Sequence, residues 1–180
     1  MEQIKILGIS GSLRTDSTNT IILNTCKTLL PANATLTVFQ GLDLIPHFSP
    51  GLEDNEAVAR FKSAVAQADA VIFSTPEYAF GLPGTLKNAL DWTVGTGEFN
   101  AKPVAAISAS PLNTGGDKAL ASLLLTLAAL GTLRNDHSSA AIPNIKGKIE
   151  QGYVTDIQTL DMLRALINNL TSLLNLRGVN

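Results

Sequence analysis

Four short runs of apolar residues, each followed by a longer segment, constrain the fold of this chain more than any other feature. The runs cover residues 4–9, 36–39, 70–74 and 104–108. The first and third are apolar almost throughout, so we expect these strands to be covered on both faces. Strands that alternate with helices form a parallel sheet between two layers of helices. The sequence therefore predicts an α/β fold.

The segments between the runs show helical periodicity. Apolar residues recur there at intervals of three and four, which predicts amphipathic helices. The expected helices contain, in order, Ile22–Leu30, Ala57–Val65, Leu86–Val94, Leu120–Leu127 and Ile157–Leu174. A fifth strand is expected within residues 132–142, at an edge of the sheet, although Arg134 and Asp136 make this segment polar. Residues 43–54 and 146–153 are expected to be irregular.

Composition excludes several classes of protein. The 180 residues show no repeat or linker, which predicts one domain, and 45% hydrophobic against 16% charged residues argue against disorder. A net charge of -2 gives no electrostatic case for binding nucleic acid. No apolar run reaches the ~18 residues of a membrane span. With no signal-peptide pattern and one cysteine, Cys26, we expect a cytoplasmic protein without an intrachain disulfide.

A loop rich in glycine and hydroxyl groups follows the first run and leads into the first helix. In this strand–loop–helix arrangement, backbone N–H groups and the helix N-terminus face an anion. The loop carries the donors Ser10, Ser12, Arg14, Ser17, Thr18 and Asn19. Ser17 also suits the N-cap of the helix, so a purely structural role for the hydroxyls stays open. The single arginine favours binding of a terminal phosphate.

Two further loops, residues 75–84 and 109–116, follow the third and fourth runs. Because the carboxyl ends of parallel strands share one edge of the sheet, we expect both to meet the loop at residues 10–19. Tyr78 and Phe80 stand beside prolines in the second of the three loops and are expected to wall a flat ligand. The three loops together predict a binding site at the topological switch point of the sheet.

The first loop lacks the signatures of two common nucleotide sites. The pattern G-x-G-x-x-G is absent because the loop holds only Gly8 and Gly11, and no acid follows the second strand to bind a ribose. The pattern G-x-x-x-x-G-K-[ST] is also absent. A monophosphate such as FMN fits a hydroxyl-rich loop with one arginine better.

Two motifs resemble those of the NADPH-dependent FMN reductase family, the flavodoxin-like group that includes quinone, azo-dye and chromate reductases. The first is G-S-L-R at residues 11–14 with Ser17 and Asn19. The second is T-P-E-Y at residues 75–78 with L-P-G-T-L-K-N-A-L-D-W at residues 82–92. The resemblance implies a flavodoxin-like three-layer sandwich with a five-stranded parallel sheet in the order 2-1-3-4-5. It also implies that residues 1–180 form a single FMN-binding domain.

The resemblance also implies which residues bind the cofactor. The residues that hold the FMN phosphate are implied to be Ser10, Ser12, Arg14, Ser17 and Asn19. Those that run along the isoalloxazine ring or close its far wall are implied to be Pro76, Glu77, Tyr78, Ala79 and Ser110. The family commonly has Asn where this chain has Ala79. A flavin contact by that side chain would be lost, whereas one by its backbone N–H would survive.

We therefore expect an FMN-dependent oxidoreductase that uses NADPH or NADH. Hydride would pass through FMN to a small-molecule acceptor (quinone-like, azo, flavin or metal-oxyanion) by a ping-pong mechanism, without an essential side-chain acid or base. The alternatives are a flavodoxin-type electron carrier, which is usually more acidic than this chain, and a redox-responsive interaction protein. The resemblance implies a homodimer or homotetramer.

Several residues are expected to be structural. Cys26 and Trp92 are expected in the core or, for Trp92, at a subunit interface, and Glu77 is expected to position a loop rather than act as a base. His47 and His137 are far apart in the sequence and lack metal-ligand spacing, so we expect no metal site. A place for Phe48 on the substrate side stays open.

Overall fold

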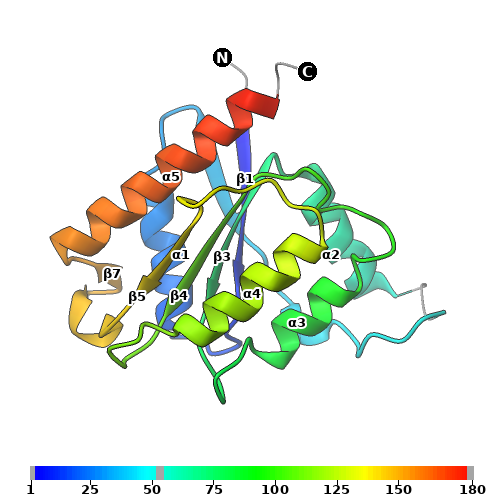
Figure 1. Cartoon of the computed structure of the whole chain (residues 1–180), viewed down its shortest axis with the longest axis horizontal. Helices are drawn as coiled ribbons and strands as arrows, with labels where there is room; N and C mark the ends of the chain where they lie inside the picture. Colours follow the sequence, from blue (N-terminus) through cyan, green and yellow to red (C-terminus); the bar gives the residue numbers. More distant parts are fainter. Residues whose placement is uncertain (1–2, 52–54, 178–180) are drawn as a thin grey trace.

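A parallel sheet between two layers of helices forms the computed structural model, which describes residues 3–51 and 55–177 (Figure 1). The five strands are β1 (Ile4–Ser10), β2 (Ala34–Val38), β3 (Ala70–Thr75), β4 (Val104–Ala109) and β5 (Ser139–Ile142). Their order in the sheet is β2-β1-β3-β4-β5, and all pairs are parallel. The predicted flavodoxin-like fold and strand order are confirmed.

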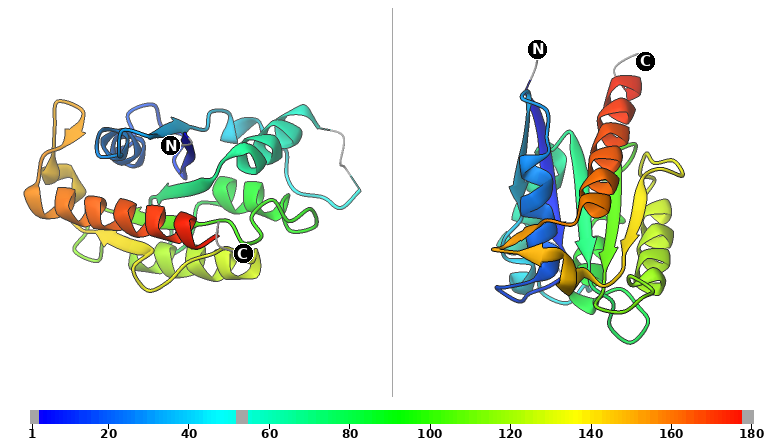
Figure 2. Two further views of the ribbon diagram at one scale, coloured as in Figure 1. Left: turned by 90° about the horizontal axis from the view of Figure 1, so that it is seen from above. Right: turned by 90° about the vertical axis from the view of Figure 1, so that its left-hand side faces the viewer.

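Helices cover both faces of the sheet (Figure 2). They are α1 (Thr18–Thr28), α2 (Glu56–Gln67), α3 (Gly84–Asp91), α4 (Asp117–Ala129) and α5 (Ile157–Arg177). The buried side chains of α1 and α5 belong to one hydrophobic core, and those of α2, α3 and α4 belong to another. The sheet separates the two cores.

The central strands supply side chains to both cores, because successive residues of a strand point to opposite faces. In β3, Val71 and Phe73 pack under α2, α3 and α4, whereas Ala70 and Ile72 pack under α1 and α5. Every residue of β3 and of β4 is buried. This double burial explains why the sequence of these strands lacks polar alternation.

The helix expected to include Val94 ends earlier than predicted. α3 begins at Gly84, as expected, but ends at Asp91, and Val94 is 65% exposed in the turn that follows. The hydroxyl of Thr93 donates to the carbonyl oxygen of Leu90 at 2.7 Å. Residues 92–96 form an irregular turn after α3. The spacing of Val94 from Leu90 therefore wrongly predicted that the helix continues to Val94.

The fifth strand is an edge strand, as predicted, but it is shorter than the segment 132–142. The side-chain oxygen of Asn135 accepts hydrogen bonds from the N–H of His137 and the hydroxyl of Ser138. The polar residues before Ser139 therefore form a turn.

Two segments expected to be irregular contain short elements. Residues 146–153 overlap a 3₁₀ helix (Ile145–Lys148) and a small hairpin of β6 (Ile149–Glu150) and β7 (Tyr153–Val154). Within 43–54, the structure has the end of a 3₁₀ helix (Leu42–Leu44), and residues 52–54 lie outside the described part of the chain. Elements this short leave little periodicity to detect.

The predicted core positions of Cys26 and Trp92 are confirmed. Cys26 is a fully buried residue of α1, and burial raises the pKa of its thiol to about 12. Trp92 is 4% exposed. The thiol is therefore neutral at physiological pH and behaves as a small apolar side chain.

A buried lysine closes the C-terminal end of α2. Lys102, two residues before β4, is 4% exposed, and its ammonium group donates to the carbonyl oxygens of Val65 at 2.8 Å and Ala68 at 2.6 Å. The last carbonyls of a helix lack partners within the helix, and a cation there also opposes the negative end of the helix dipole. Lys102 thus fastens α2 to the start of β4.

We expect Lys102→Met to lower the free energy of unfolding by about 2–3 kcal/mol, because buried carbonyl groups would lose a charged donor. Urea unfolding followed by circular dichroism measures this change. Lys62→Met, on the more exposed part of α2, is the matched control and should change the value by less than about 0.5 kcal/mol. Equal effects of the two substitutions would contradict the role given to Lys102.

Candidate functional site

The loops that follow β1, β3 and β4 meet beyond the carboxyl ends of these strands, as predicted. β1 and β3 are neighbours in the sheet, but the helices after them cover opposite faces, which is the topological switch point. A cavity of about 420 Å³ opens there, lined by all three loops. Its volume lies in the range of sites for small organic ligands.

The N-terminus of α1 forms one end of this cavity. Ser17 is the N-cap, and its Oγ accepts a hydrogen bond from the N–H of Asn19 at 3.2 Å. The hydroxyl proton of Ser17 can therefore still be donated to a ligand. The first turn of α1 contains no acidic residue, so no side chain of the helix itself opposes the positive end of the helix dipole at the cavity. Such an end binds anions.

Arg14 and Asn19 add donors at this end. Arg14 is exposed and lines the cavity, and among the described residues its guanidinium has no carboxylate partner. The amide oxygen of Asn19 accepts a hydrogen bond from the hydroxyl of Ser74 at 2.9 Å, which leaves its NH₂ group as the donor. Asp16 lies on the same wall and is the acidic residue of this loop.

Ser10 stands apart from the other residues expected to hold a phosphate. Its Oγ accepts hydrogen bonds from the hydroxyl of Thr20 at 3.2 Å and from the N–H of Ser12 at 3.3 Å. Ser12 lines both the main cavity and a smaller one of about 260 Å³ on the β2 side of the loop, whereas Ser10 borders the smaller cavity and not the main one. In the structure, Ser10 therefore stabilises the backbone of the loop and does not face the main cavity.

The second loop ends in a tight turn. The N–H and carbonyl groups of Tyr78 and Gly81 bond each other at 3.2 and 3.0 Å, and the two residues between them, Ala79 and Phe80, have φ angles of 49° and 58°. Such turns favour Asn-Gly, because other side chains are strained at positive φ. Tyr78 lines the cavity, whereas Ala79 and the 79% exposed Phe80 lie outside its wall.

Glu77 joins the second loop to the third. Its carboxylate Oε2 accepts hydrogen bonds from the backbone N–H groups of Lys118 at 2.9 Å and Ala119 at 3.0 Å, in the first turn of α4. A carboxylate is stabilised at this end of a helix by the helix dipole. The expected positioning role of Glu77 agrees with this geometry.

The third loop depends on two glycines at positive φ. A Cβ atom on Gly115 (φ 65°) would lie 3.0 Å from the backbone of Ile142. The carbonyl oxygen of Gly115 accepts a hydrogen bond from the buried hydroxyl of Ser108 at 2.9 Å. Ser110, 6% exposed, lines the cavity and accepts the N–H of Leu112 with its Oγ. Ser110 thus forms part of the wall opposite α1, as expected.

Eight of the ten residues predicted for the site line the cavity together. They are Ser12, Arg14, Ser17, Asn19, Pro76, Glu77, Tyr78 and Ser110. Sequence reasoning missed the contribution of the turn after β5, where Ile145 and Lys146 complete the wall. Extending the carboxyl-edge rule to the fifth strand would have found this turn, but the polar sequence before it obscured where that strand lies.

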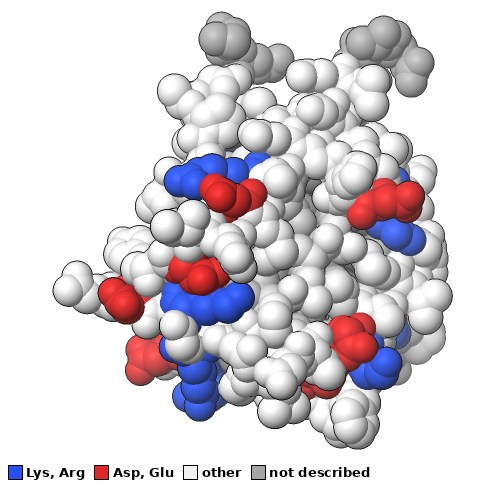
Figure 3. Space-filling model, turned by 60° about the vertical axis from the view of Figure 1, so that its left-hand side comes forward, with Lys and Arg blue, Asp and Glu red and all other residues white. Residues whose placement is uncertain are grey.

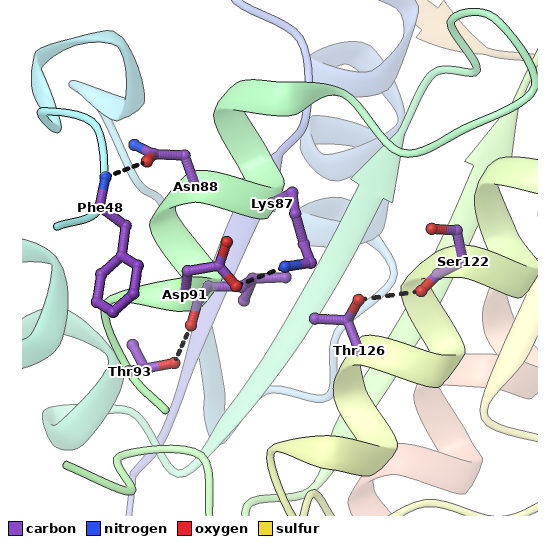
Figure 4. A network of polar contacts seen from close by, with 8 residues as sticks. Phe48, Lys87, Asn88, Asp91, Thr93, Ser122 and Thr126 are labelled. Carbon is purple, nitrogen blue, oxygen red and sulfur yellow. Dashed lines mark hydrogen bonds and ion pairs between the residues drawn. The ribbon is translucent and has the colours of Figure 1, made fainter. Parts of the chain in front are cut away.

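The second half of the second motif has a structural role. The amide oxygen of Asn88 on α3 accepts a hydrogen bond from the N–H of Phe48 at 2.7 Å (Figure 4). Its NH₂ group donates to the carbonyl oxygen of Pro46 at 2.9 Å. The indole N–H of Trp92 donates to the same carbonyl oxygen, and its ring packs edge-on against Phe48. Phe48 therefore secures the 45–48 segment to α3 and does not line the main cavity.

Charges on the surface are mixed in sign. On the face drawn in Figure 3, Lys and Arg side chains lie beside Asp and Glu side chains rather than in a single-sign patch.

Within residues 3–51 and 55–177, no helix is long and apolar enough to cross a membrane. The same residues contain no cluster of three His, Cys, Asp or Glu side chains that could hold a metal ion.

Comparison with known proteins agrees with this geometry. The family model for NADPH-dependent FMN reductases matches residues 4–147. The NAD(P)H-dependent FMN reductase of Pseudomonas aeruginosa is 33% identical over 174 residues, which cover 94% of each chain. The quinone reductase of Escherichia coli is 30% identical over 171 residues and 90% of each chain.

A solved structure extends the likeness to three dimensions. FerB of Paracoccus denitrificans, described as a flavoenzyme NAD(P)H:(acceptor) oxidoreductase, superimposes with a TM-score of 0.85 at 28% identity. The match covers 96% of this chain and 97% of that one. The motifs, the strand order and the extent of these matches agree, and the chain belongs to the NADPH-dependent FMN reductase family.

Proposed function

We propose that this chain is a single-domain FMN-dependent oxidoreductase that transfers hydride from NAD(P)H to quinone-like, azo, flavin or metal-oxyanion acceptors by a ping-pong mechanism. The cavity carries this proposal, because one end is built for a phosphate and the other for a flat ring. The phosphate end combines the N-terminus of α1 with the guanidinium of Arg14, which has no carboxylate partner in the part of the chain that the structure describes. The ring end lies between Pro76–Tyr78 and Ser110.

The residues present fit FMN. Its phosphate would be held by the hydroxyls of Ser12 and Ser17, the NH₂ group of Asn19 and the guanidinium of Arg14, which are all donors on one wall. Ser10 would support this wall through its bond to the N–H of Ser12. When bound, FMN would supply the redox chemistry, accepting a hydride from NAD(P)H and passing two electrons and a proton to the acceptor.

The protein positions the ring and stabilises its charge mainly with backbone groups. Glu77 is fixed by two hydrogen bonds to α4, so the Pro76–Tyr78 backbone is held at a set distance from the third loop. Because Ala79 lies outside the cavity wall and has no amide side chain, the backbone of residues 76–78 would contact the ring on this side instead. Fixed N–H dipoles stabilise negative charge without reorganisation.

The exposed rim of the cavity is a surface on which the nicotinamide and the electron acceptor could bind one after the other. Tyr78 is 54% exposed and Leu112 is 62% exposed, so a flat molecule can pack against either side chain from solvent. Nicotinamide and acceptor would occupy this surface in turn, which predicts ping-pong kinetics. A dependence on NAD(P)H suits the cytoplasm.

The alternative is an electron carrier of the flavodoxin type. Carriers usually have a strongly acidic surface that steers them to basic partners, whereas this chain has a net charge of -2 and mixed surface charges (Figure 3). A carrier also needs a separate reductase. Direct reaction with NAD(P)H therefore separates the two hypotheses.

We expect the purified protein, reconstituted with FMN, to show a flavin spectrum that bleaches on addition of NADPH under anaerobic conditions. The colour should return when benzoquinone is added after NADPH is consumed. Stopped-flow absorbance follows both half-reactions. A protein that binds FMN but is not reduced by NADPH would support the carrier, and one that takes up no FMN would overturn the proposed function.

Arg14→Ala should weaken FMN binding roughly 10- to 150-fold, because loss of a charge-assisted hydrogen bond costs about 1.5–3 kcal/mol. Quenching of flavin fluorescence during titration of the apoprotein gives the dissociation constant. Arg164→Ala, which removes an exposed arginine paired with Asp161 on α5, is the matched control. Unchanged FMN affinity in Arg14→Ala would remove the phosphate contact assigned to this residue.

We also propose that the chain forms a homodimer through α4, with a homotetramer as the larger alternative. Leu125 on α4 is 75% exposed, and Val94 after α3 is 65% exposed. Leu120 and Leu124 on the same helix are only partly buried. An apolar surface of this kind is covered in many proteins by a second subunit.

Leu125→Glu should convert this dimer to a monomer, because two carboxylates would be buried at a two-fold interface. Sedimentation velocity at micromolar concentration measures the change. Leu176→Glu, an equally drastic change at an exposed leucine of α5, should leave the assembly intact. A wild-type monomer at the same concentration would contradict the proposal.

A further inference from the structure

A lysine outside the predicted site lines the cavity from the turn after β5. Lys146 is exposed and contributes to the cavity wall beside Ile145. Among the described residues, no carboxylate or hydrogen-bond acceptor is paired with its ammonium group. Lys148, two residues later, instead forms an ion pair with Asp156 at 3.6 Å and donates a hydrogen bond to the hydroxyl of Thr159 at 3.2 Å. Lys146 is therefore a free cation at the rim of the cavity.

The backbone that carries Lys146 is fixed to the third loop. The N–H of Asn144 donates to the carbonyl oxygen of Leu112, and the N–H of Ile145 donates to that of Ser110, both at 3.2 Å. The side chain of Ile145 is fully buried in the core beneath α1 and α5. The turn therefore holds the backbone next to Lys146 beside Ser110 and Leu112, which line the ring end of the cavity together with Lys146.

Arg14 and Lys146 reach the cavity from two separate strands. Arg14 follows β1 and Lys146 follows β5, which are three strand spacings apart in the sheet. Because neighbouring strands are about 4.8 Å apart, the two backbone anchors are separated by roughly 14 Å. One phosphate at the N-terminus of α1 already has Arg14, two hydroxyls and an amide as donors. Lys146 is thus available for a second anionic group.

We propose that Lys146 binds a phosphate group of the dinucleotide reductant and so sets its affinity for the site. This inference rests on the proposed function, in which NAD(P)H reacts at the exposed rim of this cavity. A dinucleotide carries a diphosphate, and NADPH carries an additional 2′-phosphate, whereas quinone acceptors are uncharged. A flexible, exposed ammonium group suits a phosphate that arrives and leaves in each cycle.

Binding of the oxidised dinucleotide tests this role without turnover. Isothermal titration of the FMN-loaded protein with NADP⁺ should show roughly tenfold weaker binding for Lys146→Met than for wild type. Lys146→Arg should restore most of the affinity because it keeps the charge. Lys27→Met is the matched control, since Lys27 is an exposed lysine in the last turn of α1, at the end of that helix away from the cavity.

Kinetics and a second dinucleotide complete the test. Lys146→Met should raise KM for NADPH with little change in kcat, and leave KM for benzoquinone and the FMN content unchanged. A tenfold loss for NADP⁺ but not for NAD⁺ would identify the 2′-phosphate, and an equal loss for both would identify the diphosphate. Either result supports the proposal.

Three results would overturn it. Unchanged NADP⁺ affinity in Lys146→Met, with wild type binding normally, would overturn the role of Lys146 alone. Loss of FMN from this variant would instead place the lysine on the cofactor. A wild-type protein that neither binds NADP⁺ nor reacts with NADPH would overturn the proposed function as well, so the two failures are distinguishable.

Discussion

The site depends on the close contact between the first loop and the third strand. The N–H of Gly11 donates to the carbonyl oxygen of Ser74 at 2.8 Å, and the hydroxyl of Ser74 donates to the amide of Asn19. A Cβ atom on Gly11 would lie only 2.7 Å from the hydroxyl oxygen of Thr75, so only glycine allows this approach. The contact places the N-terminus of α1 beside the end of β3, where the second loop begins. The expected phosphate site at the start of α1 and the expected ring site at the second loop therefore belong to one continuous cavity.

A second contact, between Glu77 and the first turn of α4, fixes the other side of the cavity. The carboxylate of Glu77 binds the first turn of α4, while Gly116, at φ 81°, keeps its backbone close to the Cβ atoms of Glu77 and Ser108. Both contacts use a helix N-terminus, but in opposite ways. The N-terminus of α4 is satisfied by a side chain of the protein, whereas that of α1 faces the cavity. The difference explains why an anionic ligand is expected at α1 and not at α4.

The sheet, its helices and most of the cavity wall could be predicted from the sequence. Buried strands appear there as apolar runs, and the loops that follow parallel strands must lie at one edge of the sheet. It was less informative where a side chain bonds locally. Ser10 looks like its neighbours Ser12 and Ser17, and only the position of Thr20 shows that its hydroxyl is occupied. Asn88 and Trp92 belong to a family motif, yet they secure the 45–48 segment. The turn that carries Lys146 was obscured because Asn135 folds polar residues into a turn before a very short strand.

The second loop shows how a departure from the family pattern can be physically costly without removing the site. Ala79 and Phe80 both hold left-handed backbone conformations, and each costs about 1–2 kcal/mol relative to ordinary helical geometry. Asn tolerates this conformation better than Ala because its side chain can bond locally, so Ala79 leaves the turn more strained than the usual residue would. The strain is confined by the paired hydrogen bonds of Tyr78 and Gly81. Pro76 and Glu77 remain fixed on the side of the loop that faces the cavity, so the ring wall is preserved while the exposed tip is free to vary.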